Sequence, residues 1–223
     1  MIKNLFVGLL ISLMSSAAFA TESEIYIEQT GDALTLTITQ QNGALNKINT
    51  SINPAIINGD NNTITVMQDG ATNVLNFELR GNTNVVDLKQ EGNSNTMDFK
   101  CNEGGAFNCT DANIKFYDIG DNNTTSVVAK QNQITVDATI TGDTNTTNLT
   151  MNSQGGSLTL TVTGNTNTTT FNQSGAPVVP HSAIVSHTGN NGTLTLTQSG
   201  NITKTMNVTT NGNNHTSTIT QSD

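Results

Sequence analysis

Apolar and polar residues alternate in short runs along most of this chain. In the run Thr63–Gln68, Ile64 and Val66 fall on one side. Thr63 and Thr65 fall on the other side. Alternation with a period of two predicts a β-strand that buries one face and exposes the other. Because similar runs recur along the chain, we expect an all-β protein.

Glycines separate these runs at a regular interval. Gly59, Gly70 and Gly81 are 11 residues apart, and an asparagine follows each of them three positions later. Glycine adopts positive φ angles without steric cost, and asparagine side chains bond to nearby backbone, so both residues favour tight turns. The glycines that we expect at turns are Gly59, Gly70, Gly81, Gly92, Gly120, Gly142, Gly164 and Gly200.

Two of these 11-residue units make one larger repeat. The last residue on the inward side alternates between two series in the best-preserved stretch, which reads Gln68, Leu79, Gln90, Cys101. A strand, a turn, a second strand and a second turn can close one coil, and stacked coils bury a continuous core. We therefore expect a β-solenoid of about seven to eight coils, with two strands per coil and a 22-residue repeat, as a single domain over residues 21–223.

Three longer spacings interrupt the repeat. Prolines mark two of them, and the third contains both cysteines of the chain. We expect loop insertions near residues 53–58, 101–109 and 176–187. The cysteines enclose the middle loop, and in an exported protein their expected state is a disulfide between Cys101 and Cys109.

The first 20 residues predict export. Lys3 precedes the apolar run Leu5–Met14, and Ala18-Phe19-Ala20 forms a small-residue cleavage signal. This pattern is typical of a secretory signal peptide over residues 1–20, and the run is too short to span a membrane. We expect the mature chain to begin at Thr21, to be secreted to the cell surface or beyond, and not to insert into a membrane.

The acidic charge narrows the choice of partners. The formal net charge is −9, aromatic residues make up 4% of the chain, and there is no tryptophan. Nucleic acids and anionic membrane surfaces attract basic proteins, so neither is an expected partner. The shortage of bulky side chains also argues against a conventional globular core.

The sequence contains no recognisable catalytic motif. Gly-x-Ser-x-Gly, His-Glu-x-x-His and the phosphate-binding loop are all missing. His181, His187 and His215 show no spacing that indicates a site. Aspartates that follow turn glycines, such as Asp60, lack the spacing of calcium-binding β-helix repeats, and we interpret them as turn formers. We expect no enzyme activity, no catalytic or metal site, and no cofactor.

Several segments resemble the curlin repeat, Gln-x-Gly-x-x-Asn. The full motif occurs in Gln68-Asp69-Gly70-Ala71-Thr72-Asn73 and in Gln90-Glu91-Gly92-Asn93-Ser94-Asn95. Shorter matches begin at Gln29, Gln173 and Gln198, so the resemblance to the curlin family covers most of residues 23–221.

This resemblance implies a function. It implies a secreted subunit of curli-type fibres, a functional amyloid of the bacterial extracellular matrix that supports adhesion and biofilm formation. The chain would be the major subunit or a nucleator. Its partners would be further copies of itself, a curlin-like co-subunit and an outer-membrane export pore. In this family Gln and Asn ladders drive polymerisation, and by position this role falls on Gln29, Gln68, Asn73, Gln90, Asn95, Gln173, Gln198 and Gln221.

The residues themselves favour the same function. The run Thr216–Gln221 predicts a last strand with no evident capping helix after it. An unpaired strand edge can be extended by another copy through backbone hydrogen bonds, and solenoids that stay monomeric normally cap their ends. We therefore expect a structural protein whose activity is self-association.

Two other functions remain open. In an adhesin, the corner loops would bind a ligand and the solenoid would act as a spacer. In an ice-binding protein, outward threonine rows such as Thr159–Thr161 and Thr193–Thr195 would form a flat regular face. Asparagine, aspartate and lysine interrupt these rows in neighbouring coils, which disfavours ice binding.

Overall fold

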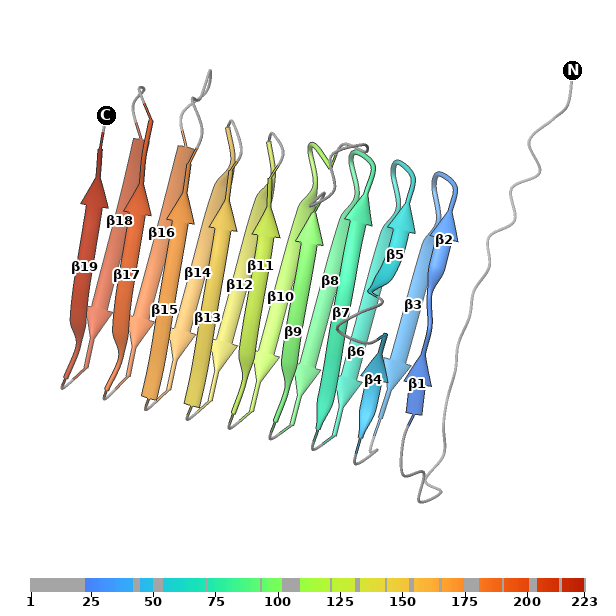
Figure 1. Cartoon of the computed structure of the whole chain (residues 1–223), viewed down its shortest axis with the longest axis horizontal. Helices are drawn as coiled ribbons and strands as arrows, with labels where there is room; N and C mark the ends of the chain where they lie inside the picture. The colour runs from blue at the N-terminus through green and yellow to red at the C-terminus, as the bar shows by residue number, and fades with distance from the viewer. Residues whose placement is uncertain are drawn as a thin grey trace, which may run out of the picture.

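The computed structural model is a solenoid of parallel β-strands (Figure 1). It describes residues 23–222 except 42–44, 50–53, 71, 93, 102–108, 121, 131–132, 143, 153–154, 165, 175–180, 190, 201–203 and 213. The signal peptide expected at residues 1–20 lies outside the described residues. The expected all-β solenoid is confirmed.

The strands form two sheets. Sheet A has 11 strands, which are β1 (Ser23–Ile25), β2 (Glu28–Thr30), β4 (Asn46–Ile48), β5 (Ala55–Asn58), β7 (Asn73–Arg80), β9 (Thr96–Cys101), β11 (Thr124–Ala129), β13 (Thr144–Met151), β15 (Thr166–Gln173), β17 (Thr193–Gln198) and β19 (Thr216–Gln221). Sheet B has eight strands, which are β3 (Thr35–Gln40), β6 (Thr63–Asp69), β8 (Val85–Glu91), β10 (Asn113–Ile119), β12 (Thr135–Thr141), β14 (Ser157–Thr163), β16 (His181–Thr188) and β18 (Lys204–Asn211).

Each coil contributes strands to both sheets. Within the described residues, six coils have one unbroken strand in each sheet, from the pair β7 and β8 to the pair β17 and β18. In the two coils before them, the sheet A strand is split into two short pieces, and β19 follows the last complete coil. The expectation of seven to eight two-strand coils is therefore corrected to six, because two coils contain an interruption in sheet A.

The strand register shows how insertions are absorbed. Thr63 pairs with Val85, 22 positions later, as the repeat predicts. Val85 pairs with Asn113, 28 positions later, because the segment that contains the cysteines lies between them. Ser157 pairs with Ser182, 25 positions later. The strands on either side of each insertion stay in register, because each inward side chain must lie over its equivalent in the coil below.

Two of the expected loop insertions include residues that form strands in the structure. Residues 55–58 of the loop expected at 53–58 form strand β5, which pairs with β2 and β7. Residues 181–187 of the loop expected at 176–187 belong to β16. Both segments have a strand pairing available in the neighbouring coil, and this pairing extends the strand up to the prolines. Residues 102–108 and 175–180 lie outside the described residues.

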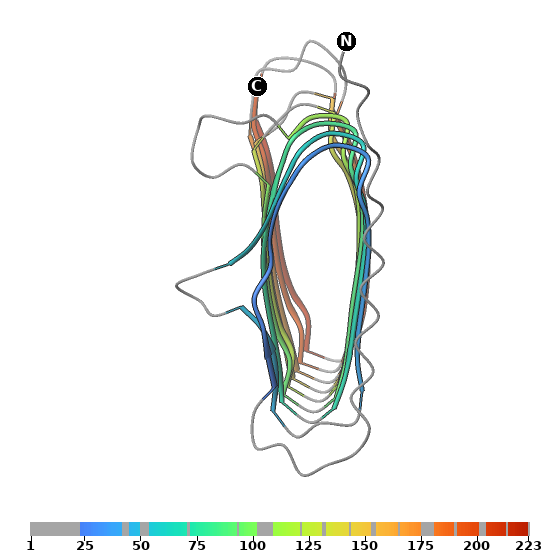
Figure 2. The ribbon, with the colours of Figure 1, turned by 90° about the vertical axis from the view of Figure 1, so that its right-hand side faces the viewer.

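The core is a narrow apolar column between the two sheets. Figure 2 looks along the stack and shows two long, nearly straight sides joined by short arcs, with the coils lying behind one another. Phe77 and Phe99 stack in sheet A with ring centroids 6.0 Å apart, and Phe116 meets Phe99 edge-on from sheet B. All three rings are fully buried. Burial of each such ring contributes about 1.5–3 kcal/mol, so the core is held by many similar rungs.

Candidate functional site

A ladder of buried glutamines lies at the end of the first strands of sheet B. The Nε2 of Gln68 donates to the Oε1 of Gln40 over 2.7 Å, and the Nε2 of Gln90 donates to the Oε1 of Gln68 over 2.8 Å. These amides are buried or nearly so. Burying an amide costs free energy unless its hydrogen bonds are made, and here Gln68 and Gln90 each donate to the glutamine of the preceding coil.

Sequence reasoning missed Gln40, which begins this ladder. Gln40 lies 28 residues before Gln68, so the regular spacing does not reach it. A signal was nevertheless present, because Thr35-Leu36-Thr37-Ile38-Thr39-Gln40 follows the same pattern as Thr63–Gln68. The matching order of β-branched, apolar and amide residues identifies the two strands as equivalents.

Asp118 occupies the next position of the ladder. It pairs in register with Gln90, and its side chain is fully buried. The Thr125 hydroxyl donates to its Oδ2 over 2.6 Å. Burial raises the pKa of Asp118 to about 7, although hydrogen bonds from Thr125 and Asn95 oppose the shift. The buried amide ladder therefore leads to a buried carboxyl whose charged form is disfavoured.

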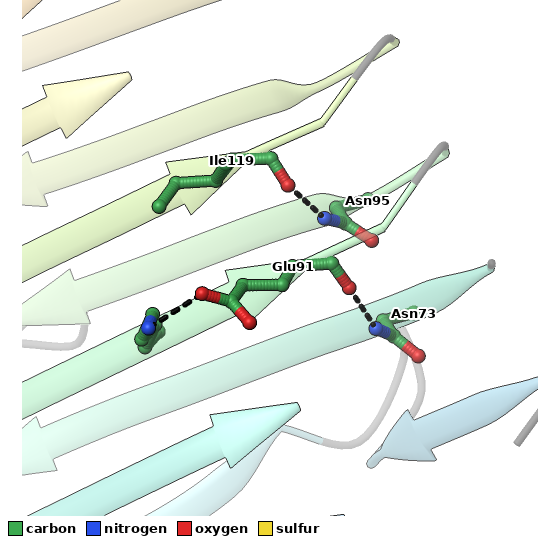
Figure 3. Close-up of polar contacts among 5 residues, drawn as sticks. Asn73, Glu91, Asn95 and Ile119 are labelled. Atoms are coloured by element: carbon green, nitrogen blue, oxygen red, sulfur yellow. Dashed lines mark hydrogen bonds and ion pairs between the residues drawn. The ribbon is translucent and has the colours of Figure 1, made fainter. Parts of the chain in front are cut away.

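Asn73 and Asn95 bind backbone rather than each other. The Nδ2 of Asn73 donates to the carbonyl of Gly70 in its own turn and to the carbonyl of Glu91 one coil further on. The Nδ2 of Asn95 makes the same two bonds, to Gly92 and to Ile119. Figure 3 shows the two bonds that reach the next coil. The expected side-chain ladder is found for the sheet B glutamines, whereas these asparagines tie each turn to the turn that follows.

The turn glycines form two columns, one on each arc of the coil. Gly59 and Gly81 follow sheet A strands, whereas Gly70, Gly92, Gly120, Gly142 and Gly164 follow sheet B strands. Gly200 follows β17 of sheet A. A Cβ on Gly142 would overlap the carbonyl oxygen of Gly120, and a Cβ on Gly81 would overlap that of Gly59. Side chains are therefore excluded because the arcs stack backbone on backbone.

The other four glutamines of the expected ladder lie in a single column of sheet A. Gln173 pairs with Gln198, which pairs with Gln221, and their inward positions continue the column of Leu79 and Cys101. Gln29, at the other end of the molecule, belongs to the same column through its pairing with Ile57. In the part of the chain that the structure describes, the amides of Gln173 and Gln198 are buried without a hydrogen-bond partner.

The cysteine pair closes one insertion. Cys101 and Cys109 form a disulfide with their Cα atoms 5.8 Å apart, and both side chains are fully buried. Cys101 ends β9 on the inward side of sheet A. The bond therefore anchors both ends of the inserted segment to the core, which allows the ladder to resume in register at β10.

In the described part of the chain, the strands at both ends of the solenoid have a neighbour on one side only. Among the described residues, β19 pairs only with β17 and β18 pairs only with β16. Ile219 lies on the inward side of β19, in register with Leu196, yet 53% of it is exposed. At the opposite end, β1, β2 and β3 also have one neighbour each along the stack. Both ends therefore offer backbone groups and inward side chains to a further strand.

Two histidines meet at the last arc. The Nδ1 atoms of His187 and His215 are 3.2 Å apart, and the Nε2 of His215 lies 2.7 Å from the carbonyl oxygen of Asn211. The carbonyl can only accept, so the neutral His215 carries its proton on Nε2, and the Nδ1 of His187 is the donor between the rings. Thr193 pairs with Thr168, so the preceding residue, Gly192, takes the position that Asn167 has one coil earlier. A Cβ on Gly192 would collide with both histidine rings. Burial and the nearby His215 lower the pKa of His187 to about 4.

A shallow groove lies on the outer face of sheet A near the interruption between β4 and β5. Its volume is about 550 Å³, and Tyr26, Pro54, Ile56, Glu78 and Arg80 are among its lining residues. The Nε of Arg80 contacts the Oε1 of Glu78 over 2.7 Å, and this hydrogen bond raises the pKa of Arg80. The groove is thus a mixed aromatic and charged surface.

The described residues contain no group of three or more side chains placed to hold a metal ion. They also include no helix with the length and hydropathy of a bilayer span. Comparison with protein-family models, with curated proteins and with solved structures found no match. The candidate sites are therefore the polar ladders, the free ends and the outer faces of the sheets.

Proposed function

We propose that this protein is a secreted structural subunit that assembles end to end into curli-like amyloid fibres, as a major subunit or a nucleator. The observation that carries the proposal is the uncovered inward row of β19, formed by Ser217, Ile219 and Gln221. Ile219 is half exposed because no further coil covers it, and the first coil of a second copy can cover it.

The two ends have matching rows. The inward row of sheet A is Ser217, Ile219 and Gln221 at one end and Ile25, Ile27 and Gln29 at the other. If the first coil of one copy follows β19 of another, Ile219 lies over Ile27. Gln221 then lies over Gln29, so the column of Gln173 and Gln198 continues across the junction.

Sheet B gives the same match. The inward residues Met206 and Val208 of β18 are equivalent in register to Leu36 and Ile38 of β3, so apolar side chains again meet apolar side chains. Backbone hydrogen bonds along both sheets would join the copies, and strand pairing of this kind gives affinity that rows of matching side chains make specific. The resemblance to curlin repeats supports the same conclusion.

The proposal is tested with two lysine substitutions on one strand. Ile219→Lys places a charge in the junction, whereas Thr220→Lys places the same charge on the outer face of β19. Both positions are exposed in the single chain, so both variants should fold. We expect wild type and Thr220→Lys to form fibres with a cross-β spacing of about 4.8 Å. We expect Ile219→Lys to remain monomeric.

Two results would contradict end-to-end assembly. Wild-type protein that stays monomeric for days, without thioflavin fluorescence or a cross-β reflection, would exclude fibre formation. Equal fibre growth by both variants would show that the β19 edge is not the junction. A small fraction of Ile219→Lys protein added to wild type should shorten the fibres, because its first coil still adds to an end that it then blocks.

The groove favours a second candidate function, a surface adhesin. Tyr26 is 60% exposed on this groove and lies among charged side chains, a combination that suits a polar ligand. In that case Tyr26→Ala should reduce adhesion to host or matrix surfaces without changing fibre growth. Unchanged adhesion by this variant would remove the groove from consideration.

A further inference from the structure

The outer face of sheet A carries a regular array of threonines. Register places the outward residues of β13, β15, β17 and β19 in three rows that cross the strands. The first row is Thr146, Thr168, Thr193 and Thr216. The second is Asn148, Thr170, Thr195 and Thr218, and the third is Thr150, Asn172, Thr197 and Thr220. We call these residues the threonine array.

The expected interruptions of the threonine rows are present, and the register shows where along the solenoid they fall. On the outer face of sheet A, the second row leads through Ser126 to Asp98 and the third through Val128 to Lys100, so the uncharged part of this face begins at β11. On the outer face of sheet B, Lys115 pairs with Asp137, which pairs in turn with Thr159, so the row of Thr159 is interrupted as expected. Within the threonine array only Asn148 and Asn172 depart from threonine, and the first row continues through Thr124 to Thr96.

The array is regular in two directions. Strands in a sheet lie about 4.8 Å apart, and alternate residues along a strand lie about 6.6 Å apart. Threonine is β-branched, which restricts χ1, and a threonine on each side in the row restricts it further. The hydroxyl and methyl groups are therefore held at repeating positions on a nearly straight face of the coil (Figure 2).

The charge and composition of the array indicate its ligand. Strands β11 to β19 of sheet A contain no acidic or basic residue, although the whole chain carries 17 acidic and 8 basic residues. A neutral face matches an uncharged partner. The array also has no outward aromatic ring on which a sugar polymer could stack. A neutral lattice that repeats hydrogen-bonding and apolar positions fits a face of this composition.

We propose that the threonine array binds the surface of ice. One threonine holds a water molecule weakly, but a rigid array meets many sites of a crystal at once, and such repeated contacts add up to strong binding. Liquid water has no fixed lattice, so the array would distinguish the two. The array lies on a side face and not on an end, so this inference is independent of end-to-end assembly.

The test uses the mature chain and two matched variants. Thr195→Lys changes the centre of the array, and Thr161→Lys changes an equally half-buried outward threonine on β14 of sheet B. Wild type and Thr161→Lys should enrich in slowly grown ice and should open a gap between melting and freezing temperatures. Thr195→Lys should lose both effects. Thr170→Lys, one strand away in the array, repeats the test should Thr195→Lys fail to fold by circular dichroism.

Three results would overturn the proposal. The first is exclusion of the wild-type protein from ice with no gap between melting and freezing. The second is retention of ice binding by both Thr195→Lys and Thr170→Lys, which would place the contact on another face. The third is a wild-type dimer in sedimentation that Thr195→Lys dissociates while neither form enters ice, which would show that the array is covered by a second copy.

Discussion

Asp118 pairs in register with Gln90 between β10 and β8, and it takes the position where the glutamine ladder would continue. The Oε1 of Gln90 and the Oδ1 of Asp118 are both buried, and neither has a hydrogen-bond partner among the described residues. A protonated Asp118 can donate to Gln90, whereas a carboxylate presents a second acceptor. The raised pKa of Asp118 has the same origin, since burial disfavours the charged form.

We expect Asp118→Asn to stabilise the protein at pH 8. Asparagine supplies the missing N–H donor to Gln90 without a buried charge, so the free energy of unfolding should rise by on the order of 2 kcal/mol. Urea unfolding at pH 8 measures this change. The control is Asp137→Asn, which removes an outward aspartate from the next strand of sheet B and should change the stability little. A loss of stability in Asp118→Asn would show that the carboxylate is needed.

The same residue predicts a fall in wild-type stability as the pH rises. The folded pKa of Asp118 is about 7, above the unfolded value near 4, so the folded state binds more protons between these pH values. Its contribution to stability is complete below about pH 4 and is lost as pH rises through about 7. Asp118→Asn should abolish this part of the pH profile, and a profile identical to that of wild type would contradict the assignment.

His187 predicts the opposite dependence on the acid side. Its folded pKa of about 4 lies below the unfolded value near 6.5, so the unfolded state binds more protons in this window. Its contribution is present above about pH 6.5 and is lost as pH falls towards 4. His187→Val, which continues the apolar column of Val162, should raise stability at pH 5 by about 1–2 kcal/mol. Thermal unfolding at pH 5 and pH 8 measures this, and equal sensitivity to acid in the variant would contradict it.

We expect Thr83→Asn to increase the stability of the protein. Thr83 has φ 58°, in a column of turn residues that also includes Asn61 with the same φ of 58°. A β-branched residue is strained in this left-handed region, whereas asparagine tolerates it. Thr83→Asn should therefore stabilise the protein by about 1 kcal/mol, measured by urea unfolding. The reverse exchange, Asn61→Thr, should destabilise it by a similar amount, and opposite signs would exclude backbone strain as the cause.

Gly142→Ala should disrupt the stacking of the arcs. Its Cβ would overlap the carbonyl oxygen of Gly120 in the coil below. Gly31→Ala is the matched control, because Gly31 also has positive φ but its nearest neighbour, the Nε2 of Gln29, is 3.8 Å from the added Cβ. We expect a loss above about 3 kcal/mol for Gly142→Ala and about 1 kcal/mol for Gly31→Ala. Similar losses would mean that φ alone matters, and not close contact between coils.

Local pattern accounts for much of what the sequence predicted. The alternation in Thr63–Gln68 determines a strand, and Gly70 with Asn73 determines the turn that follows. Both depend on neighbours within a few residues. The stacking of Gln68 under Gln90 also follows from the sequence, because no insertion separates them and the 22-residue spacing carries over directly.

The repeat pattern alone did not predict contacts between residues that are separated by an insertion. Gln40 joins the ladder across 28 residues, and His187 meets His215 across the same distance. Spacing cannot predict these pairs, since the length of an insertion does not say where the strand resumes. The packing of the coil below decides the register, because only one alignment returns every inward side chain to the core.

By itself, then, the amino-acid order determined the strands, the turns and the stacked coil, since each depends on short-range backbone preference and on a period that the chain repeats. Only the tertiary structure decided which sheet receives each strand. That assignment brings the uncharged strands β11, β13, β15, β17 and β19 together in sheet A and places Asp118 in the buried ladder. The physical reason is that side chains from different coils become neighbours only when the backbone ladders have closed.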